Sequence, residues 1–442
     1  MSVKVNISDL TLKQQETLDK MLTFTPENKM RHQNFAPSEE PVSFYFSKNG
    51  KVHVPYRFAC MYFKKVFNKY EFPNMYENSE FKGRLLSRQE EPFSRAMDYL
   101  NKCNTCTIAL YPGFGKTFLG CMISHKLNNI TCVLVHRENV GSQWVKSFGN
   151  LAPDLKNNIW FVDNKKLKIE PKFIVCMADR TDKIPDDLKD KVGTLIIDEA
   201  HCFCSKSRVK SLLAFSPRYT IAETATPTKD NGMHKMIQSI CGTHYIQKIS
   251  DKPYNCYIIQ TNLDIKTKQN SFTELVSNQC NSDVRNDIIV NLVLNNRHKK
   301  IIIVSPRVGH CDLIHKRIEE NGIKAGKLYG KVKDYESSNV LIGTTSKMGV
   351  GFDEANFCKD YDGRASDLLI VTQTFKSWPS FEQVRGRGMR ADHPSVVYLN
   401  DKHAITRRHM SIMRRYIKET KGVLCEIKIK ENNLTNQNIY VK

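Results

Sequence analysis

The stretch that most constrains how this 442-residue chain can fold is ALYPGFGKT, residues 109–117. An apolar run leads into a turn with two glycines, and the turn ends in Lys116 and Thr117 just before a segment with helical periodicity. Gly113 and Gly115 allow positive φ and let the backbone approach a ligand without a Cβ in the way. The pattern predicts a strand, a tight turn and a helix whose N-terminus can face a phosphate group.

The residue types in this turn suit a nucleotide. Lys116 can reach the β- and γ-phosphates, Thr117 can bind Mg²⁺, and the backbone around Phe114 can line the phosphates. The general formula has Gly at the position of Leu110, six residues before Lys116. The turn alone therefore leaves two interpretations open: a nucleotide site, or a strand-turn-helix that only looks like one.

A second motif, TLIIDEAHCF, begins about 80 residues downstream. Its aliphatic run predicts a buried strand that delivers Asp198 and Glu199 to the carboxyl edge of a sheet, where α/β proteins bind ligands. Asp198 can hold Mg²⁺, and Glu199 can orient and deprotonate the water that attacks the γ-phosphate. The alternative is that Asp198 only caps a helix. Both halves of a Mg-nucleotide site in this order favour the first interpretation.

The charge of the chain indicates a polyanionic partner. Lys and Arg number 67 against 46 Asp and Glu, a net charge of +21, which attracts phosphate polymers or anionic membranes. No run of about 18 apolar residues could span a bilayer, and the first fifteen residues lack the apolar segment of a signal peptide. We therefore expect an intracellular protein that binds nucleic acid. The 14 cysteines are scattered and many lie in apolar runs, which fits reduced, buried thiols. The C-x-x-C pair at 103 and 106 has no second pair nearby, which argues against a zinc site.

Short β-branched runs alternate with helical segments, which predicts an α/β fold with two successive parallel sheets of about five strands each. The predicted strands are 107–111, 131–135, 172–177, 194–198 and 219–224 in the first half, and 299–305, 323–329, 339–344, 367–372 and 395–399 in the second. A polar region from about 247 to 296 joins the halves and holds a strand at 254–260 and a helix at 283–296. SFYFSKNGKVHVPYRF, before the first sheet, predicts a β-hairpin around Asn-Gly.

Four motifs in a fixed order resemble a known family: GFGKT, DEAH at 198–201, TATP at 224–227 and QVRGRGMR at 383–390. They look like motifs I, II, III and VI of superfamily 2 helicases, and the resemblance covers about residues 83–400. It implies two RecA-like domains with ATP between them and a nucleic-acid strand across their shared upper face. The expected division is an N-terminal extension, 1–82, two RecA-like domains, 83–246 and 247–420, and a C-terminal tail, 421–442.

The resemblance implies roles in catalysis for Gln383, Arg387 and Arg390 of the last motif. The two arginines would act as fingers on the γ-phosphate bound by the first domain, because a planar guanidinium suits a phosphate. The alternative is a basic surface run that binds phosphate polymers directly. Coupling between hydrolysis and movement would use His201 and the two threonines of TATP, Thr224 and Thr226.

Further motifs of the family can be placed with the same resemblance. Gln89 matches the glutamine that reads adenine, and GTTSKMGVGFD, 343–353, looks like motif V, in which Gly351 and Asp353 would face the nucleotide. HRENVGSQW, 136–144, takes the position of motif Ia, and SPR, 305–307, that of motif IV. The residues expected to contact the nucleic-acid strand are His136, Arg137, Ser305, Arg307 and Thr344.

Two other features are less decisive. The segment 405–418 predicts a helix with four arginines, which could line a nucleic-acid path or form a solvated face. Trp144 and Phe148 lie four residues apart on a predicted helix, so we expect them to pack in the core.

Within the superfamily the DEAH form and the Gln-Trp pair after motif Ia resemble the branch with the XPB repair helicase, the phage helicase UvsW and the transcript-release helicases of large DNA viruses. This implies a viral, nucleic-acid-dependent ATPase that uses ATP and Mg²⁺ to move on DNA or an RNA–DNA hybrid, in transcript release or in recombination and repair. Its partners would include transcription or replication machinery, and its location the host cytoplasm or nucleus and the virion. An RNA helicase, a duplex translocase that does not separate strands, and a non-hydrolysing scaffold stay open, as does the oligomeric state, with a monomer as one option.

Overall fold

The computed structural model divides the chain into two compact units, Met1–Lys248 and Ile249–Lys442, each described by itself. The residues described are 2–25, 40–63, 72–76, 79–163, 167, 169–225, 232–250, 252–268, 271–349, 352, 354–375, 378–388, 391–429 and 439–441, without the side chains of 356, 378–380 and 387–388.

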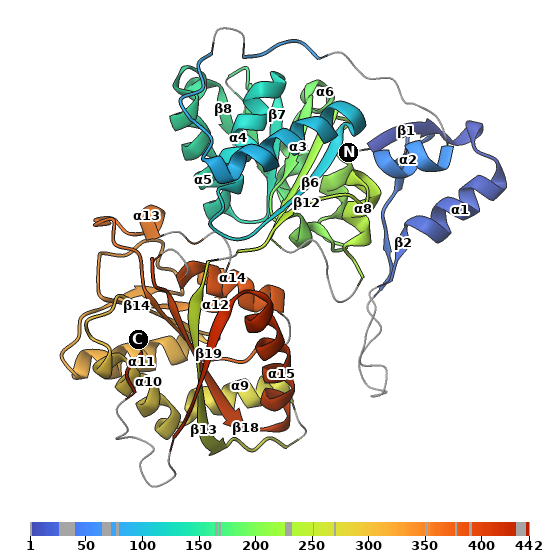
Figure 1. The fold of residues 1–442 in the computed structure, drawn as a ribbon. Helices are drawn as coiled ribbons and strands as arrows, with labels where there is room; N and C mark the ends of the chain where they lie inside the picture. Colours follow the sequence, from blue (N-terminus) through green and yellow to red (C-terminus); the bar gives the residue numbers. More distant parts are fainter. Residues whose placement is uncertain are drawn as a thin grey trace. The chain divides into compact units, whose positions relative to one another are not determined.

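A seven-stranded parallel sheet forms the centre of the first unit, in the order β12-β6-β11-β10-β7-β9-β8 (Figure 1). Four of the five inner strands, β6, β11, β10 and β7, are buried along their whole length, which explains why they are almost entirely aliphatic, Thr or Cys. The strands are β6 (Thr105–Leu110), β7 (Thr131–Val135), β8 (Ile159–Phe161), β9 (Phe173–Met177), β10 (Thr194–Ile197), β11 (Tyr219–Thr224) and β12 (Ile246–Lys248).

Helices cover both faces of this sheet and create two apolar cores. One core lies under α3 (Ser87–Cys103), α4 (Lys116–Leu127) and α5 (Glu138–Leu151). The other lies under α6 (Asp186–Lys191), α7 (Val209–Leu213) and α8 (Lys235–Cys241), and it extends into the N-terminal elements. The carboxyl ends of all seven strands meet at one edge of the sheet, between these two layers.

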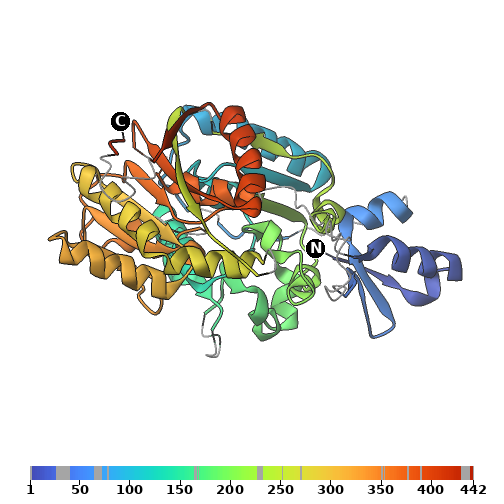
Figure 2. The same cartoon turned by 90° about the horizontal axis from the view of Figure 1, so that it is seen from below.

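The N-terminal elements form a small antiparallel sheet, in the order β1-β5-β4, and the helix α2 that follows it packs beside α8 (Figures 1 and 2). The predicted hairpin is confirmed: β4 and β5 join through Asn49 and Gly50, whose φ angles of 51° and 71° suit a tight hairpin turn. The first residue described, Ser2, donates its backbone N–H to the carbonyl of Phe215 at 3.0 Å. The elements are β1 (Ser2–Asn6), α1 (Leu12–Leu22), β2 (Thr23–Phe24), β3 (Val42–Ser43), β4 (Phe46–Lys48), β5 (Lys51–Pro55) and α2 (Tyr56–Phe63).

The second unit repeats the architecture with another seven-stranded parallel sheet, in the order β15-β16-β14-β17-β18-β13-β19. Its longest strand, β13, lies between β18 and β19 and pairs with both. The strands are β13 (Tyr254–Asp264), β14 (Ile301–Ser305), β15 (Ala325–Leu328), β16 (Val340–Thr344), β17 (Leu368–Val371), β18 (Ser395–Lys402) and β19 (Gly422–Lys428).

Two helical layers enclose the second sheet. The gold and orange helices α10 and α11 lie on one face and the red helix α15 on the other, as Figure 2 shows and as their separate apolar cores require. The helices of this unit are α9 (Phe272–Asn281), α10 (Asp283–Asn295), α11 (Val308–Glu320), α12 (Thr345–Gly349), α13 (Glu354–Phe357), α14 (Trp378–Gly388) and α15 (Ala404–Glu419).

The predicted fold class is confirmed, because both units have parallel sheets flanked by helices and a small antiparallel sheet precedes them. The predicted number of about five strands per sheet is too low. The prediction for the first sheet lacks the strands β8 and β12. Each has three residues, which are too few to show the alternation of apolar and polar residues typical of a strand. In the second sheet the joining strand β13 and the C-terminal β19 are members of the sheet itself.

Candidate nucleotide site

The turn after β6 has the geometry that its two glycines predict. Gly113 and Gly115 have φ angles of 84° and 102°, in the region that side-chain-bearing residues rarely adopt. The helix α4 begins at Lys116, whose Nζ donates a hydrogen bond to the carbonyl of Leu110 at 3.1 Å. The ammonium group is thus held inside the turn, and Thr117 occupies the first turn of α4.

Leu110 causes no defect in this turn. It is the last residue of β6, it is fully buried, and it belongs to the core under α3, α4 and α5. Its backbone is not among those with positive φ. A leucine therefore fits where the general formula has glycine, because the side chain packs into the sheet and the left-handed conformations occur only further along the turn.

Gln89, on α3, makes a hydrogen bond to the backbone of this turn. Its amide Nε2 donates to the carbonyl of Phe114 at 3.0 Å, and its Oε1 accepts the backbone N–H of Leu86 at 3.0 Å. A Cβ added at Gly115 would lie 2.5 Å from Nε2 of Gln89, so the Gln89 amide would have to move to admit a side chain there. The structure brings Gln89 to the turn; its predicted contact with adenine stays a prediction.

The DEAH segment follows β10 at the same carboxyl edge. Asp198 is buried, and one of its oxygens, Oδ2, accepts a hydrogen bond of 2.8 Å from the indole Nε1 of Trp144. Burial, and next the charge of Glu199, raise the pKa of Asp198 to about 6, while the Trp144 bond and the charge of Lys116 act in the opposite direction. The carboxyl group thus lies within electrostatic range of the phosphate loop.

Glu199 and His201 connect this acidic group to the next strand. Glu199 has a φ of 49°, an unusual value for a residue with a side chain, and its Oε2 lies 3.4 Å from Nδ1 of His201. The same Nδ1 lies 2.9 Å from Oγ1 of Thr224, at the end of β11. The helical turn that follows is capped by Glu199 without a side-chain hydrogen bond, so Asp198 does not serve as its N-cap.

Sequence reasoning missed a second acid behind this group, Glu223. It is fully buried on β11, and neither carboxyl oxygen has a hydrogen-bond partner among the described residues. Burial, followed by the charge of Asp198, raises the pKa of Glu223 well above its usual range. A glutamate inside the otherwise apolar and threonine-containing run YTIAET was the available signal.

The donors at this edge fit Mg²⁺. A carboxylate from Asp198 and a hydroxyl from Thr117 are hard oxygen ligands, and Mg²⁺ usually takes few protein ligands and completes its shell with water and phosphate. Within the described residues no group of three or more His, Cys, Asp or Glu is arranged to hold a metal. Asp198 and Thr117 are therefore the protein oxygens at this edge that could hold the ion.

Residues of motif Ia lie at the end of the neighbouring strand β7. His136 and Arg137 precede α5, and the ring of His136 is largely enclosed. Burial, and next the charge of Arg137, lower the pKa of His136 to about 4, so its ring is neutral at pH 7. Trp144 lies on the helix that follows. It packs in the core as predicted, but its hydrogen bond to Asp198 was not foreseen.

In the second unit, motifs IV and V come together. Ser305 and Thr344 are paired residues at the carboxyl ends of β14 and β16. The buried hydroxyl of Ser305 lies 2.8 Å from Nδ1 of His310, and the backbone N–H of Arg307 donates to the same hydroxyl at 3.3 Å. The other ring nitrogen of His310 lies 2.8 Å from the side-chain oxygen of Asn286. This buried network fixes the backbone that carries Arg307.

The last motif lies on α14, which includes Gln383. The fully buried Arg385 anchors this helix: it makes a bidentate ion pair with Glu382 and lies 4.6 Å and 5.6 Å from the ring centres of Tyr254 and Tyr416. Sequence reasoning missed Arg385. Of the remaining predicted residues, the side chain of Arg387 and the whole of Thr226, Gly351, Asp353 and Arg390 lie outside the described residues.

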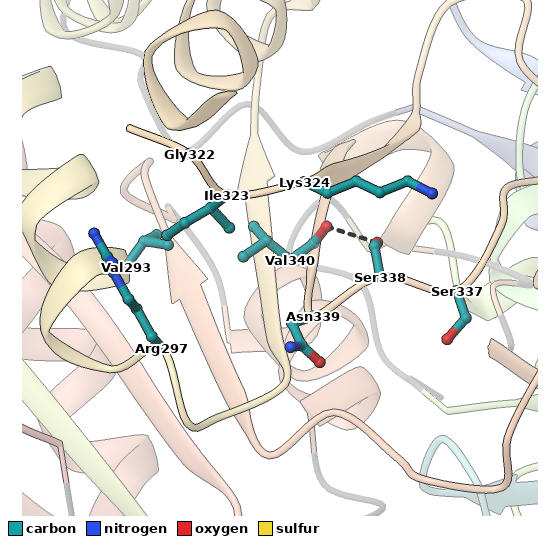
Figure 3. A pocket seen from close by; sticks show the side chains of 9 residues that line it. All are labelled: Val293, Arg297, Gly322, Ile323, Lys324, Ser337, Ser338, Asn339 and Val340. Carbon is teal, nitrogen blue, oxygen red and sulfur yellow. Dashed lines mark hydrogen bonds between the residues drawn. The ribbon is translucent and has the colours of Figure 1, made fainter. Parts of the chain in front are cut away.

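Pockets of the second unit lie at both edges of its sheet. One of about 480 Å³ opens at the amino ends of β15 and β16, opposite the edge with Ser305 and Thr344 (Figure 3). Another, of about 440 Å³, lies at the carboxyl ends of β13 and β18 and at the start of α15, and its basic lining includes Lys266, Lys402 and Arg407. The second pocket therefore shares the edge of motifs IV and V.

These features are typical of nucleotide-binding α/β proteins: a glycine turn that leads into a helix, an acidic strand end at the same edge, and a second parallel sheet later in the chain. Residues 82–229 match the model of the family described as type III restriction enzyme, res subunit. "Putative helicase 161L" of Invertebrate iridescent virus 6 is 24% identical over 414 residues, 86% of this chain and 91% of that protein. "Putative helicase 055L" of Frog virus 3 is 22% identical over 338 residues, 74% of this chain and 75% of that protein.

Solved structures agree on the fold. Yeast Dbp5 bound to RNA and ADP BeF3 aligns with a TM-score of 0.55 at 12% identity, covering 76% of this chain and 89% of that one. A putative HsdR subunit of a type I restriction enzyme from Vibrio vulnificus aligns with a TM-score of 0.55 at 15% identity, covering 77% of this chain and 68% of that one. The matched family model and the two viral relatives support an ATP-dependent helicase of superfamily 2. No helix in the described ranges has the length and apolar character that crossing a bilayer requires.

Proposed function

We propose that this helicase is a viral motor that couples hydrolysis of Mg-ATP to movement along DNA or an RNA–DNA hybrid, in transcript release or in recombination and repair. The observation that carries the ATPase part is one carboxyl edge with both halves of a nucleotide site. Lys116 lies inside the phosphate loop, and Asp198, within electrostatic range, lies at the end of β10. The viral relatives support the viral setting.

Each residue at this edge has its own role in ATP hydrolysis under this proposal. Lys116 exchanges its bond to the carbonyl of Leu110 for the β- and γ-phosphates, which stay against the N-terminus of α4. Asp198 and Thr117 would hold Mg²⁺, which would neutralise phosphate charge. Glu199 orients the attacking water and accepts its proton. Arg387, Arg390 and Gln383 belong to the second unit, and their action on the γ-phosphate remains part of this proposal.

The contact between His201 and Thr224 supports the coupling role. Nδ1 of His201 lies close to both the Glu199 carboxylate and the Thr224 hydroxyl. A shift of Glu199 during hydrolysis would therefore change the hydrogen bond that reaches the end of β11. The TATP segment begins at Thr224. The contacts from Glu199 through His201 to Thr224 would therefore link the reacting phosphate to the backbone of that segment.

Binding of the nucleic-acid strand is assigned to the carboxyl edges of both sheets. His136 and Arg137 follow β7, and Ser305, Arg307 and Thr344 lie at the ends of β14 and β16. A neutral His136 ring and backbone N–H groups can bind phosphate oxygens without reading base sequence. The excess of 21 positive charges strengthens such contacts along the whole strand.

Two other substrates have support from the relatives. A mimivirus protein named "Putative ATP-dependent RNA helicase L396" is 22% identical over 410 residues, which favours an RNA helicase as the second candidate. The fold is also similar to that of the HsdR subunit, and a duplex translocase therefore remains a third candidate. Contacts to the phosphate backbone are common to all three, so the substrate must be measured.

The test is ATP hydrolysis with single-stranded DNA, single-stranded RNA, an RNA–DNA hybrid or duplex DNA. We expect stimulation by DNA or the hybrid, and a loss of activity in Lys116→Ala and Glu199→Gln. Lys126→Ala, an exposed position on the same helix as Lys116, is the matched control and should keep wild-type activity. Hydrolysis that no nucleic acid stimulates, or that survives Lys116→Ala, would refute the motor.

Displacement of a strand from forked substrates then separates a helicase from a duplex translocase.

A further inference from the structure

We infer that Trp144 is a positioning residue, whose indole N–H holds the Asp198 carboxylate in the orientation that receives Mg²⁺ with the nucleotide. This inference rests on the proposed ATPase function. The hydrogen bond from Nε1 to Oδ2 measures 2.8 Å, Trp144 is fully buried and Asp198 is 6% exposed. A bond with this length and burial is directional and cannot be replaced by bulk water.

The indole ring is itself held rigidly from two sides. Phe173 of β9 lies nearly parallel to it, with ring centres 6.4 Å apart and 28° between the planes. On the other side lies Gly120 of α4, where an added Cβ would come within 2.5 Å of the indole Cη2. Gly120 is one helical turn after Lys116. The helix that begins at the phosphate loop therefore leaves the space in which the indole reaches Asp198.

Glu223 borders the same space as the indole. Oε1 of Glu223 would lie 2.7 Å from the same Cβ at Gly120, so the carboxyl of Glu223 and the indole share one buried space beside α4. The indole N–H reaches Asp198 from this space and fixes its Oδ2, so the carboxylate keeps one orientation toward the cation.

A purely packing role for Trp144 makes a different prediction. If the ring only fills space, then Trp144→Phe, which keeps an aromatic ring and removes the N–H, should affect stability without affecting Mg²⁺. If the N–H positions Asp198, the same change should weaken the Mg²⁺-dependent part of nucleotide binding. Outer-shell partners of metal ligands typically change metal affinity by about 10–100-fold.

The experiment measures binding of a fluorescent ADP analogue by anisotropy, with and without Mg²⁺, together with kcat and KM for ATP. For Trp144→Phe we expect affinity without Mg²⁺ within about 2-fold of wild type, and at least about a 10-fold higher Mg²⁺ concentration for half-maximal binding. The drop in activity should lie in kcat at limiting Mg²⁺ and recover at high Mg²⁺. Trp160→Phe, a buried tryptophan on β8, is the matched control and should behave like wild type.

Two further variants test the same interaction independently of Trp144→Phe alone. Gly120→Ala leaves the indole intact but pushes it away, and it should show the same Mg²⁺ defect even if Trp144→Phe folds poorly. In an Asp198→Asn background, Trp144→Phe should add no further loss, because the two residues act through one interaction. Wild-type Mg²⁺ dependence in both Trp144→Phe and Gly120→Ala, or losses that simply add in the double variant, would overturn the inference. A wild-type protein that neither binds Mg-ADP nor hydrolyses ATP would overturn the proposed function as well.

Discussion

The buried acid Glu223 should make the protein less stable as the pH rises, and Glu223→Gln should remove that effect. Its pKa in the folded protein is raised well above the usual 4.5, first by burial and then by the charge of Asp198. Below about pH 4.5 the group is protonated in both the folded and the unfolded chain, and it adds no pH dependence. Above that pH the unfolded chain loses this proton and the folded chain keeps it, so unfolding becomes easier.

The magnitude follows from linkage and from the missing partners. One proton released on unfolding changes the free energy of unfolding by about 1.4 kcal/mol per pH unit, up to the folded pKa. At neutral pH a buried polar group without a partner costs about 1–3 kcal/mol, and neither oxygen of Glu223 has one among the described residues. Glu223→Leu, which removes the polar group, should therefore be more stable than wild type at pH 7. For a unit of 248 residues, each kcal/mol corresponds to about 2–4 °C in Tm.

The assay is thermal unfolding followed by circular dichroism between pH 5 and 8, for wild type, Glu223→Gln and Glu223→Leu. The difference in Tm between each variant and wild type should grow with pH. Glu170→Gln, at an exposed position, should follow the wild-type curve. Parallel curves for wild type and Glu223→Gln, or a Glu223→Leu protein that unfolds at a lower temperature at pH 7, would show that the group has a partner or is ionised in the folded state.

Three other substitutions test separate parts of the structure. Gly115→Ala should weaken nucleotide binding by at least about 10-fold, because a φ of 102° disfavours any side chain and the added Cβ would displace the Gln89 amide that supports the turn. Gly149→Ala, with 3.4 Å of clearance, should bind normally in the same titration. Arg407→Glu, in the basic pocket at the start of α15, should weaken nucleic-acid binding and lower the slope of log K against log salt by about 1. Arg415→Glu, on the same helix, should leave the affinity and the slope unchanged if only the pocket contacts phosphate. Arg385→Met should destabilise the second unit by about 3–5 kcal/mol in denaturant unfolding, because it strands the buried carboxylate of the ion pair; a loss below 1 kcal/mol would contradict this.

Much of the fold was predictable because aliphatic strands in parallel sheets are buried on both faces. Strands such as β10 and β14 read as unbroken apolar runs, and the segments between them read as helices. The edges of the sheets were less predictable. A three-residue strand such as β12 acquires its structure from pairing with β6, which local sequence cannot reveal. The strand β19 lies in the predicted C-terminal tail, and its place beside β13 depends on contacts across more than 150 residues.

The residues of the phosphate loop and the DEAH segment were predictable because their chemistry is local. Glycine where φ is positive, lysine for phosphate and a carboxylate after an apolar strand can each be read from a short stretch. Trp144, Gly120 and Glu223 could not be assigned in this way. They lie on α5, α4 and β11, and they meet only because these elements pack against one another. Their spacing in sequence carries no sign of that contact.

The same reasoning explains why both units gather their motifs at one edge. Every pairing in the two large sheets is parallel, so each strand presents its carboxyl end on the same side, and the loops that follow converge there. In the first unit these loops carry Lys116, Asp198 and Thr224; in the second they carry Ser305 and Thr344. A motif placed at a strand's amino end would lie on the opposite side, as the pocket beside Asn339 does in Figure 3. Residues far apart in the chain can therefore meet at one edge of a sheet without any special connection, provided that each follows a strand of the same parallel sheet.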